Sequence, residues 1–169
     1  ITPSDEFLRN IQNLCQKYEV SFIADEIQSG YGRTGKFFAH QHAEVKPDLI
    51  TMAKGMGNGF PIGGVLIHPK FQAKYGLLGT TFGGNHLACA ASIAVLEVLE
   101  EEKLAANAVR QFEFVRRSVE NIPQIKKLKG RGLMLGLEFD FSVADLRKEL
   151  LFNHKIFTGA SSNKNLLRI

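Results

Sequence analysis

Residues 49–55 read LITMAKG, a short apolar run that ends at Lys54 and is followed by glycine. Two other runs have the same form: VSFIA at residues 20–24, which ends in Asp25, and GGVLI at residues 63–67, which follows a glycine-rich turn. Each run predicts a buried strand. Continuous apolar strands separated by helical or loop segments indicate an α/β sheet covered on both faces.

The two charged residues at the ends of these strands point to a site. In open α/β sheets, ligands bind beyond the carboxyl ends of the strands. Asp25 and Lys54 both fall at such ends. We therefore expect their side chains to lie near each other at one edge of the sheet, on the pattern of the sequence alone.

The rest of the chain predicts helices and a second domain. Thr2 as N-cap, Pro3 at the first helical position and an acidic first turn predict a helix that continues to Tyr18. Beyond the glycine-rich loop at residues 79–84 we expect the following elements: helices over 87–99, 104–122 and 144–152, and strands over 126–128, 133–139, 156–157 and 166–167. This order predicts part of a large α/β domain over residues 1–100 and an incomplete α+β domain over residues 101–169.

The bulk composition is that of an ordinary globular protein. The chain has 169 residues, 44% of them hydrophobic, and a net charge of only +4, with the basic residues spread along it. These numbers argue against nucleic-acid binding, and no apolar stretch is long enough for a membrane helix. Cys15 and Cys89 sit in apolar helical patterns, which predicts free, buried thiols and a cytoplasmic protein. The chain starts without Met and stops inside an apolar strand, so we expect a fragment.

Two short motifs are decoys. Residues 30–35 match G-x-G-x-x-G, but four residues separate the motif from Asp25, and Phe37 follows Lys36 where a phosphate-binding loop needs Ser or Thr. A tight loop that uses glycines for positive φ explains the match better. His40 and His42 form H-x-H without a third metal ligand at a recognisable spacing, so no metal site is expected.

The combination of three elements is more specific than any one of them. DEIQ at residues 25–28 is followed by Lys54, 29 positions after Asp25 (54 minus 25), and then by GTTFGGN at residues 79–85. This order resembles the class III (subgroup II) aminotransferases, enzymes of the pyridoxal 5′-phosphate-dependent transferase fold type I, over essentially the whole chain. The resemblance is closest to the acetylornithine branch of that family.

The resemblance implies roles for six residues. Lys54 would bond covalently to the cofactor and move protons in catalysis, and Asp25 would keep the pyridine nitrogen protonated. Gln28 would hydrogen-bond the ring oxygen, and Ile27 would pack on the ring face. Thr81 would reach the cofactor phosphate of the other subunit of a homodimer. Arg168 would hold the substrate α-carboxylate.

The implied reaction moves the δ-amino group of N²-acetylornithine, or of succinylornithine, to 2-oxoglutarate in arginine biosynthesis. Its partners are therefore small amino acid and 2-oxo acid substrates. Ornithine or 4-aminobutyrate as the amino donor, or an aminomutase of the same fold, stays open, because residues that choose the substrate lie outside this chain. A catalytically inactive structural fragment is the alternative from another class.

Overall fold

The computed structural model describes residues 2–77 and 79–169 and forms two compact units, residues 3–106 and residues 107–169. The division falls inside helix α3 (Leu104–Val119), a few residues beyond the boundary predicted at residue 100. Among the described residues, none of the helices is both long and apolar enough to cross a membrane.

The first helix of the first unit, α1 (Asp5–Lys17), begins later than predicted. Ser4, not Thr2, is its N-cap, and the Ser4 hydroxyl accepts a hydrogen bond from the amide of Phe7 at 3.1 Å. Ser4 has the extended backbone conformation of a cap, so Pro3 lies before the helix and not in its first turn. The acidic first turn, Asp5 and Glu6, is as predicted.

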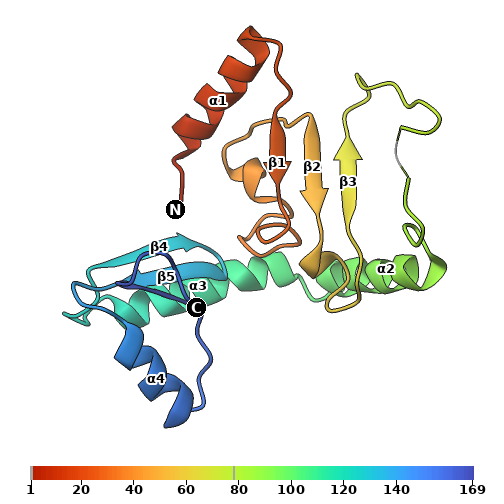
Figure 1. The fold of residues 1–169 in the computed structure, drawn as a ribbon. Helices are drawn as coiled ribbons and strands as arrows, with labels where there is room; N and C mark the ends of the chain where they lie inside the picture. Colours follow the sequence, from red (N-terminus) through yellow and green to blue (C-terminus); the bar gives the residue numbers. More distant parts are fainter. Residues whose placement is uncertain (1, 78) are drawn as a thin grey trace. The chain divides into compact units, whose positions relative to one another are not determined.

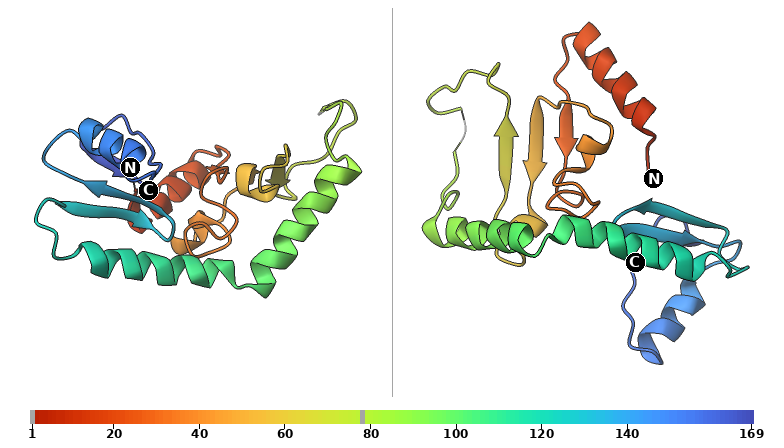
Figure 2. Two further views of the ribbon diagram at one scale, coloured as in Figure 1. Left: turned by 90° about the horizontal axis from the view of Figure 1, so that it is seen from below. Right: turned by 180° about the vertical axis from the view of Figure 1, so that it is seen from behind.

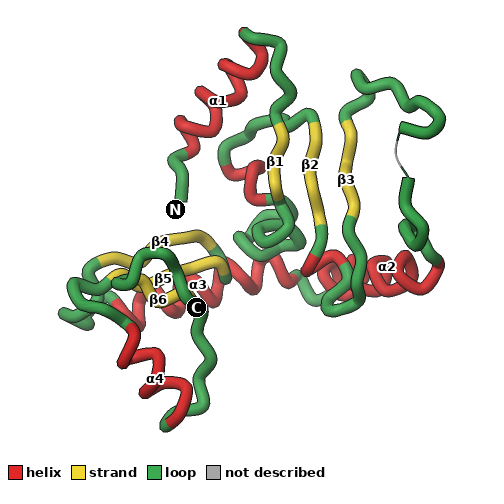
Figure 3. The backbone as a smooth tube through the Cα atoms, viewed as in Figure 1, coloured by secondary structure: helices red, strands yellow, loops and turns green. Residues whose placement is uncertain are grey.

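Three strands form the sheet of the first unit in the order β1 (Ile23–Asp25), β2 (Leu49–Met52) and β3 (Gly64–Ile67). In Figure 1 the β1 and β2 arrows point the same way and β3 points the opposite way, in agreement with the parallel and antiparallel pairing. Figure 3 shows the loops that follow β1 and β2 leaving the same edge of the sheet. Asp25 is paired with Thr51, which places the end of β1 beside the turn that begins at Lys54.

Strand β1 is shorter than the predicted run. The amide of Val20 donates to the carbonyl of Cys15 at the end of α1, and the amide of Phe22 donates to the Asp48 carboxylate at 2.8 Å. Both residues are therefore held by other partners and do not join the ladder.

The expected cover on both faces of the sheet is absent within the described chain. Ile23 is 56% exposed and Leu66 is 49% exposed. The prediction of buried strands is wrong for this chain by itself, because its described elements do not enclose these side chains. The predicted burial of the thiols is wrong as well, since Cys89 is exposed and Cys15 is partly exposed.

The two long helices agree with the prediction. Helix α2 (His86–Glu101) begins at the cap Asn85, whose side chain accepts from the amide of Ala88 at 2.9 Å. Helix α2 contacts the 3-10 turn η2 (Lys54–Met56) that follows β2. Helix α3 ends at Val119, three residues before the predicted end at Ile122.

The second unit contains a small sheet, a short helix and the part of helix α3 beyond residue 106. Strands β4 (Lys127–Arg131), β5 (Met134–Glu138) and β6 (Leu166–Arg168) form an antiparallel sheet, and helix α4 (Ala144–Phe152) connects β5 to the segment before β6. The hairpin and α4 are the cyan and blue elements in Figure 2. The core of this unit is apolar and comes from strands and loops: Leu137, Phe139, Val143 and Leu167.

One predicted strand of this unit is wrong. Residues 156–157 form no strand, because the amide of Ile156 donates to the carbonyl of Leu150 in α4 at 2.8 Å. Phe157 is 85% exposed. Only Gly159, two residues later, makes a bridge, with Arg168 of β6.

Candidate active site

Asp25 ends β1 with a carboxylate that is held on one side only. Its Oδ1 accepts from the amide of Ile27 and from the hydroxyl of Thr51, both at 3.1 Å. Within the described chain, no protein group bonds Oδ2, and the side chain is exposed. A carboxylate with one oriented oxygen and one open oxygen is prepared to accept from a positively charged or N–H donor.

Glu26, the next residue, points the other way and is 3% exposed. Its two oxygens accept four hydrogen bonds: from the hydroxyl of Ser29, from the amide of Ala39 at 3.0 Å, and from the amide and Nδ1 of His40 at 2.8 and 3.0 Å. Burial by itself would raise the pKa of Glu26, but the hydrogen bonds outweigh it and hold the pKa at about 2, from an ordinary 4.5. The Glu26 carboxylate therefore closes the loop of residues 26–40 with both of its oxygens hydrogen-bonded.

Lys54 begins the turn η2 in a backbone conformation that is rare for its type. Its φ is 46°, in the left-handed region that non-glycine residues seldom adopt. The side chain is exposed, and its amine makes no hydrogen bond or ion pair with any residue that the structure describes. Non-glycine residues held in this conformation concentrate at functional sites, so the strain at Lys54 is consistent with the role predicted for it.

The loop after β1 uses positive φ as expected, though not at every glycine of the motif. Gly32 and Gly35 have φ of 79° and 96°, and between Gly30 and Gly32 the residue Tyr31 has φ of 56°. Gly30 is needed for space instead, because a Cβ there would lie 2.9 Å from the carbonyl oxygen of Glu26. The motif is a tight loop closed by Glu26 and not a nucleotide-binding turn.

The two histidines of the H-x-H motif serve this loop. His40 bonds Glu26, and Nε2 of His42 lies 3.1 Å from both oxygens of Thr34. Within residues 2–77 and 79–169, no group of three or more His, Cys, Asp or Glu side chains is arranged to hold a metal ion.

Gln28 and Ile27 follow Asp25 in the same loop, Gln28 exposed and Ile27 partly buried. Thr81 is exposed in the loop that leads into α2, and no described residue bonds its hydroxyl. Its neighbour Thr80 accepts from the amide of Gly83 at 3.1 Å and so fixes the turn. The structure therefore brings Asp25, Ile27 and Gln28 together with the Lys54 turn on neighbouring strand ends, and records no bond between Thr81 and any of them.

Arg168 belongs to the other compact unit, in β6. Its backbone pairs with Gly159, and a Cβ on Gly159 would lie 3.0 Å from the Cβ of Arg168 and 3.2 Å from its Nε. The absence of a side chain at Gly159 thus leaves room for the aliphatic part of the Arg168 side chain. The guanidinium is exposed and has no partner in the described part of the chain, as a substrate-binding arginine would require.

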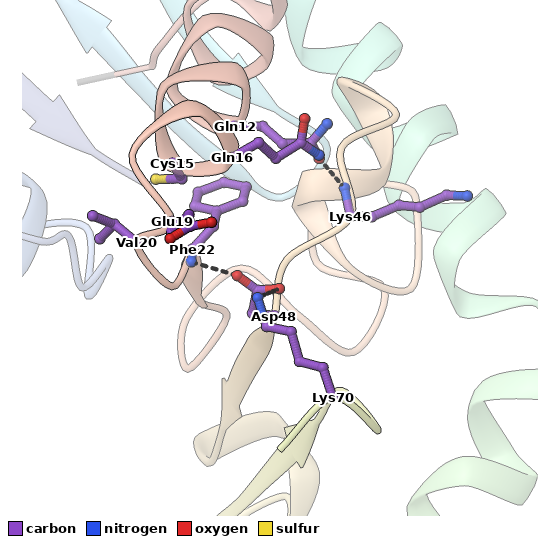
Figure 4. A pocket seen from close by; sticks show the side chains of 9 residues that line it. All are labelled: Gln12, Cys15, Gln16, Glu19, Val20, Phe22, Lys46, Asp48 and Lys70. Carbon is purple, nitrogen blue, oxygen red and sulfur yellow. Dashed lines mark hydrogen bonds and ion pairs between the residues drawn. The ribbon is translucent and has the colours of Figure 1, made fainter.

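A pocket of about 350 Å³ lies at the opposite end of the strands (Figure 4). Its lining comes from α1 and from residues that precede β1 and β2 or follow β3: Gln12, Cys15, Gln16, Glu19, Val20, Phe22, Lys46, Asp48 and Lys70. Lys70 pairs with Asp48 and, by its hydrogen bond, lowers the pKa of that carboxyl. None of the six predicted site residues lines this pocket, so it is separate from the candidate active site.

Comparison with known proteins decides the family, because the model of aminotransferase class III matches residues 1–160. The chain belongs to the class III aminotransferase family. It is 41% identical to the acetylornithine aminotransferase of Corynebacterium efficiens, over 100% of this chain but 42% of that protein. The chain therefore spans less than half the length of this relative.

Solved structures of class III aminotransferases share the fold. The acetylornithine aminotransferase of Elizabethkingia anophelis superimposes with a TM-score of 0.86 at 32% identity, over 99% of this chain and 44% of that one. An ornithine aminotransferase of Toxoplasma gondii, described with partial occupancy of PLP at its active site, gives a TM-score of 0.87 at 33% identity, over 99% and 42% of the two chains. These matches confirm the predicted fold type.

The cofactor of class III aminotransferases is pyridoxal 5′-phosphate, and the residues of this chain fit it. Asp25 offers an open carboxylate oxygen for a protonated ring nitrogen. Lys54 offers an exposed amine without a competing partner, on the neighbouring strand end. An acceptor and a nucleophilic amine side by side are the two groups that this cofactor needs from a protein.

The contacts of Tyr31 with the residues around Lys54 could not be predicted from the sequence. The residue lies between two glycines of a motif that was set aside as a turn, and nothing in its spacing marks it. Its positive φ and its contacts with the Lys54 turn emerge only from the folded loop.

Proposed function

We propose that the full-length protein is a pyridoxal-phosphate-dependent aminotransferase that takes the δ-amino group of N²-acetylornithine, or succinylornithine, and delivers it to 2-oxoglutarate. The observation that carries the proposal is the pairing of Asp25 with Thr51 across parallel strands, which sets the open carboxylate next to the turn of Lys54. The 41% identity to an acetylornithine aminotransferase supports this choice of donor. A role in arginine biosynthesis, in the cytoplasm, goes with that substrate.

Lys54 is the proposed catalytic residue. When bound, the cofactor supplies an electron sink for the negative charge that develops on the substrate carbon. The Lys54 amine would hold the cofactor covalently in the resting enzyme. Once released by the incoming amino group, Nζ would remove the proton from the Cδ atom of the donor in the first half-reaction and would deliver a proton to the Cα atom of the new amino acid in the second. Exposure of the amine gives it access to both positions.

Asp25, Ile27 and Gln28 would orient the ring. The open oxygen of Asp25 accepts the N–H of the pyridine nitrogen and keeps it charged, while the amide of Ile27 and the hydroxyl of Thr51 hold the other oxygen in place. Gln28 would donate to the ring oxygen, and the partly buried Ile27 would pack against one ring face.

Thr81 and Arg168 complete the proposed set. Thr81 would bond the cofactor phosphate of a second subunit, so the enzyme would be a homodimer with shared active sites. Arg168 would bind the α-carboxylate of the substrate through two parallel hydrogen bonds. Both side chains are exposed and unpaired within the described chain, which leaves them available for these ligands.

Ornithine is the second candidate donor. The structural match to the Toxoplasma ornithine aminotransferase is as good as the match to the acetylornithine enzyme. The full-length enzyme should be tested against acetylornithine, succinylornithine, ornithine and 4-aminobutyrate with 2-oxoglutarate as acceptor. The highest kcat/KM with one of the two acylated donors supports the proposal, and a clear preference for free ornithine would replace it.

Attachment of the cofactor tests Lys54 directly. Borohydride reduction of the cofactor-loaded full-length enzyme should leave the label on the peptide that contains Lys54, and Lys54→Ala should abolish the labelling. Lys103→Ala is a matched control, because Lys103 is also exposed and has a φ of 52°. A label that stays in place in Lys54→Ala contradicts the assignment.

A further inference from the structure

Tyr31 lies against the turn that carries Lys54, and it contacts the chain both before the lysine, at the end of β2, and after it. The Tyr31 hydroxyl lies 4.0 Å from the sulfur of Met52, two residues before Lys54. A Cβ on Gly55, the residue after Lys54, would lie 3.1 Å from the Cβ of Tyr31. One side chain therefore packs against residues on both sides of the lysine, although it comes from the loop after β1.

The Lys54 backbone needs such support. Its φ of 46° is strained for a residue with a side chain, because the Cβ comes close to the following carbonyl oxygen. The turn has its own hydrogen bonds, from Met56 to Ala53 at 3.0 Å and from Gly57 to Lys54 at 3.3 Å. The pairing of β1 with β2 places the turn beside Asp25, and Tyr31 adds a side-chain contact from the loop after β1 to the turn itself.

Tyr31 is itself firmly held. Its ring lies 5.2 Å from that of Phe37, which meets Phe38 edge-on at 4.7 Å, and Phe38 stacks on His40. His40 in turn bonds Glu26, the residue next to Asp25. A continuous row of rings thus joins the strand end that carries the carboxylate to the turn that carries the amine.

The hydroxyl of Tyr31 is kept as a donor. Burial raises the pKa of the phenol above its usual 10, so it stays protonated under all ordinary conditions. The sulfur end of the O–H···S contact belongs to a buried residue, since Met52 is 9% exposed, and Tyr31 is partly buried. The contact is a weak one, and the ring and Cβ of Tyr31 are expected to contribute more than its hydroxyl.

We propose that Tyr31 is a positioning residue that holds the backbone of Lys54 in its left-handed conformation. In that conformation the Lys54 amine would reach the cofactor bound at Asp25. The proposal rests on the function proposed above. Gly55 is its counterpart, because any side chain at 55 would press on Tyr31 and move the turn by a few tenths of an ångström.

A double-mutant cycle on the full-length enzyme tests the contact, with the dissociation constant of pyridoxal phosphate and the borohydride label on Lys54 as readouts. Gly55→Ala should weaken cofactor binding about tenfold, since a misplacement of about 1 Å can cost about 100-fold and the added Cβ displaces the turn by part of that distance. In a Tyr31→Gly background, Gly55→Ala should have little further effect, because the Cβ that it presses on is gone. Tyr31→Phe keeps the ring and Cβ and should stay within about threefold of wild type, since only the weak sulfur contact is lost.

The outcomes separate this proposal from the one on which it rests. A wild-type label on a residue other than Lys54 refutes both. A label on Lys54, with Gly55→Ala equally damaging whether or not Tyr31 is present, refutes only the role of Tyr31. If Tyr31→Gly does not fold, Gly55→Ala still decides: a wild-type dissociation constant and a wild-type label in that variant overturn the proposal. A merely structural role would lower stability and leave the cofactor dissociation constant of the folded enzyme unchanged.

Discussion

Replacing Glu26 by glutamine should loosen the loop after β1 without changing its shape. Glutamine has nearly the same size as glutamate, but it offers one acceptor oxygen and an NH₂ group where the carboxylate has two acceptors. Each Glu26 oxygen receives two donors, and whichever side the NH₂ group takes, one backbone amide, that of Ala39 or that of His40, loses its partner, while the Ser29 hydroxyl or the His40 ring nitrogen can accept from the NH₂ group instead. An unsatisfied buried donor costs about 1–3 kcal/mol.

The pKa gives an independent magnitude. A pKa of about 2 in place of 4.5 corresponds to at most about 3 kcal/mol, at about 1.36 kcal/mol per pKa unit. Solvent screening reduces this ceiling, and about 2 kcal/mol is a fair expectation for Glu26→Gln at pH 7. Because the folded pKa is lowered, the contribution is complete above about pH 4.5 and is lost as the pH falls towards 2.

Amide hydrogen exchange in the full-length enzyme without cofactor is the suitable assay, because it measures the loop locally and does not require all units to unfold together. The amides of Ala39 and His40 should exchange about 30-fold faster in Glu26→Gln at pH 7, the equivalent of about 2 kcal/mol. The difference from wild type should be constant from pH 7 to 5 and shrink below about 4.5. Glu100→Gln, an exposed change on α2, is the control. Equal exchange at both amides, or a difference that grows with acid, would refute the reasoning.

Three further predictions concern other parts of the chain. Ser4→Ala should destabilise the first turn of α1 by about 1 kcal/mol through loss of the cap, measured as faster exchange of the Phe7 amide. Gly130→Ala should destabilise the hairpin by more than about 2 kcal/mol in urea unfolding, because the φ of Gly130 is 111° and a Cβ there would collide with the carbonyl of Met134. Gly79→Ala is the control and should be near neutral, because a Cβ at residue 79 would meet nothing within 4 Å. Asp25→Asn should lower kcat about 100-fold or more in a steady-state assay while the urea midpoint moves little, since the side chain is exposed and its oxygen still accepts from Thr51.

Elements with strong local signals were predictable from the sequence. Helix α4 was predicted at the observed bounds, and β2 and β3 differ from their predicted runs by one residue each. Two of the errors in the strands arose where a group outside the sheet took a backbone amide. The amide of Phe22 is taken by the Asp48 carboxylate and that of Ile156 by the carbonyl of Leu150, so neither joins a sheet. No periodicity in the sequence contains those contacts.

For the candidate site too, one part of the arrangement was predictable from the sequence and another part was not. The neighbourhood of Asp25 and Lys54 was predictable, because two strand ends of one parallel pair must meet at one edge of the sheet. The conformation of Lys54 was not predictable, because it depends on Gly55 leaving room for Tyr31. Tyr31 in turn is held by a row of rings that ends at His40, which bonds Glu26. The local sequence therefore determines which strand end carries the Lys54 amine. The orientation of that amine depends on the loop after β1, which starts more than twenty residues earlier in the chain. For this reason we expect substitutions at Tyr31 and Glu26 to change cofactor binding, although neither side chain needs to touch the cofactor.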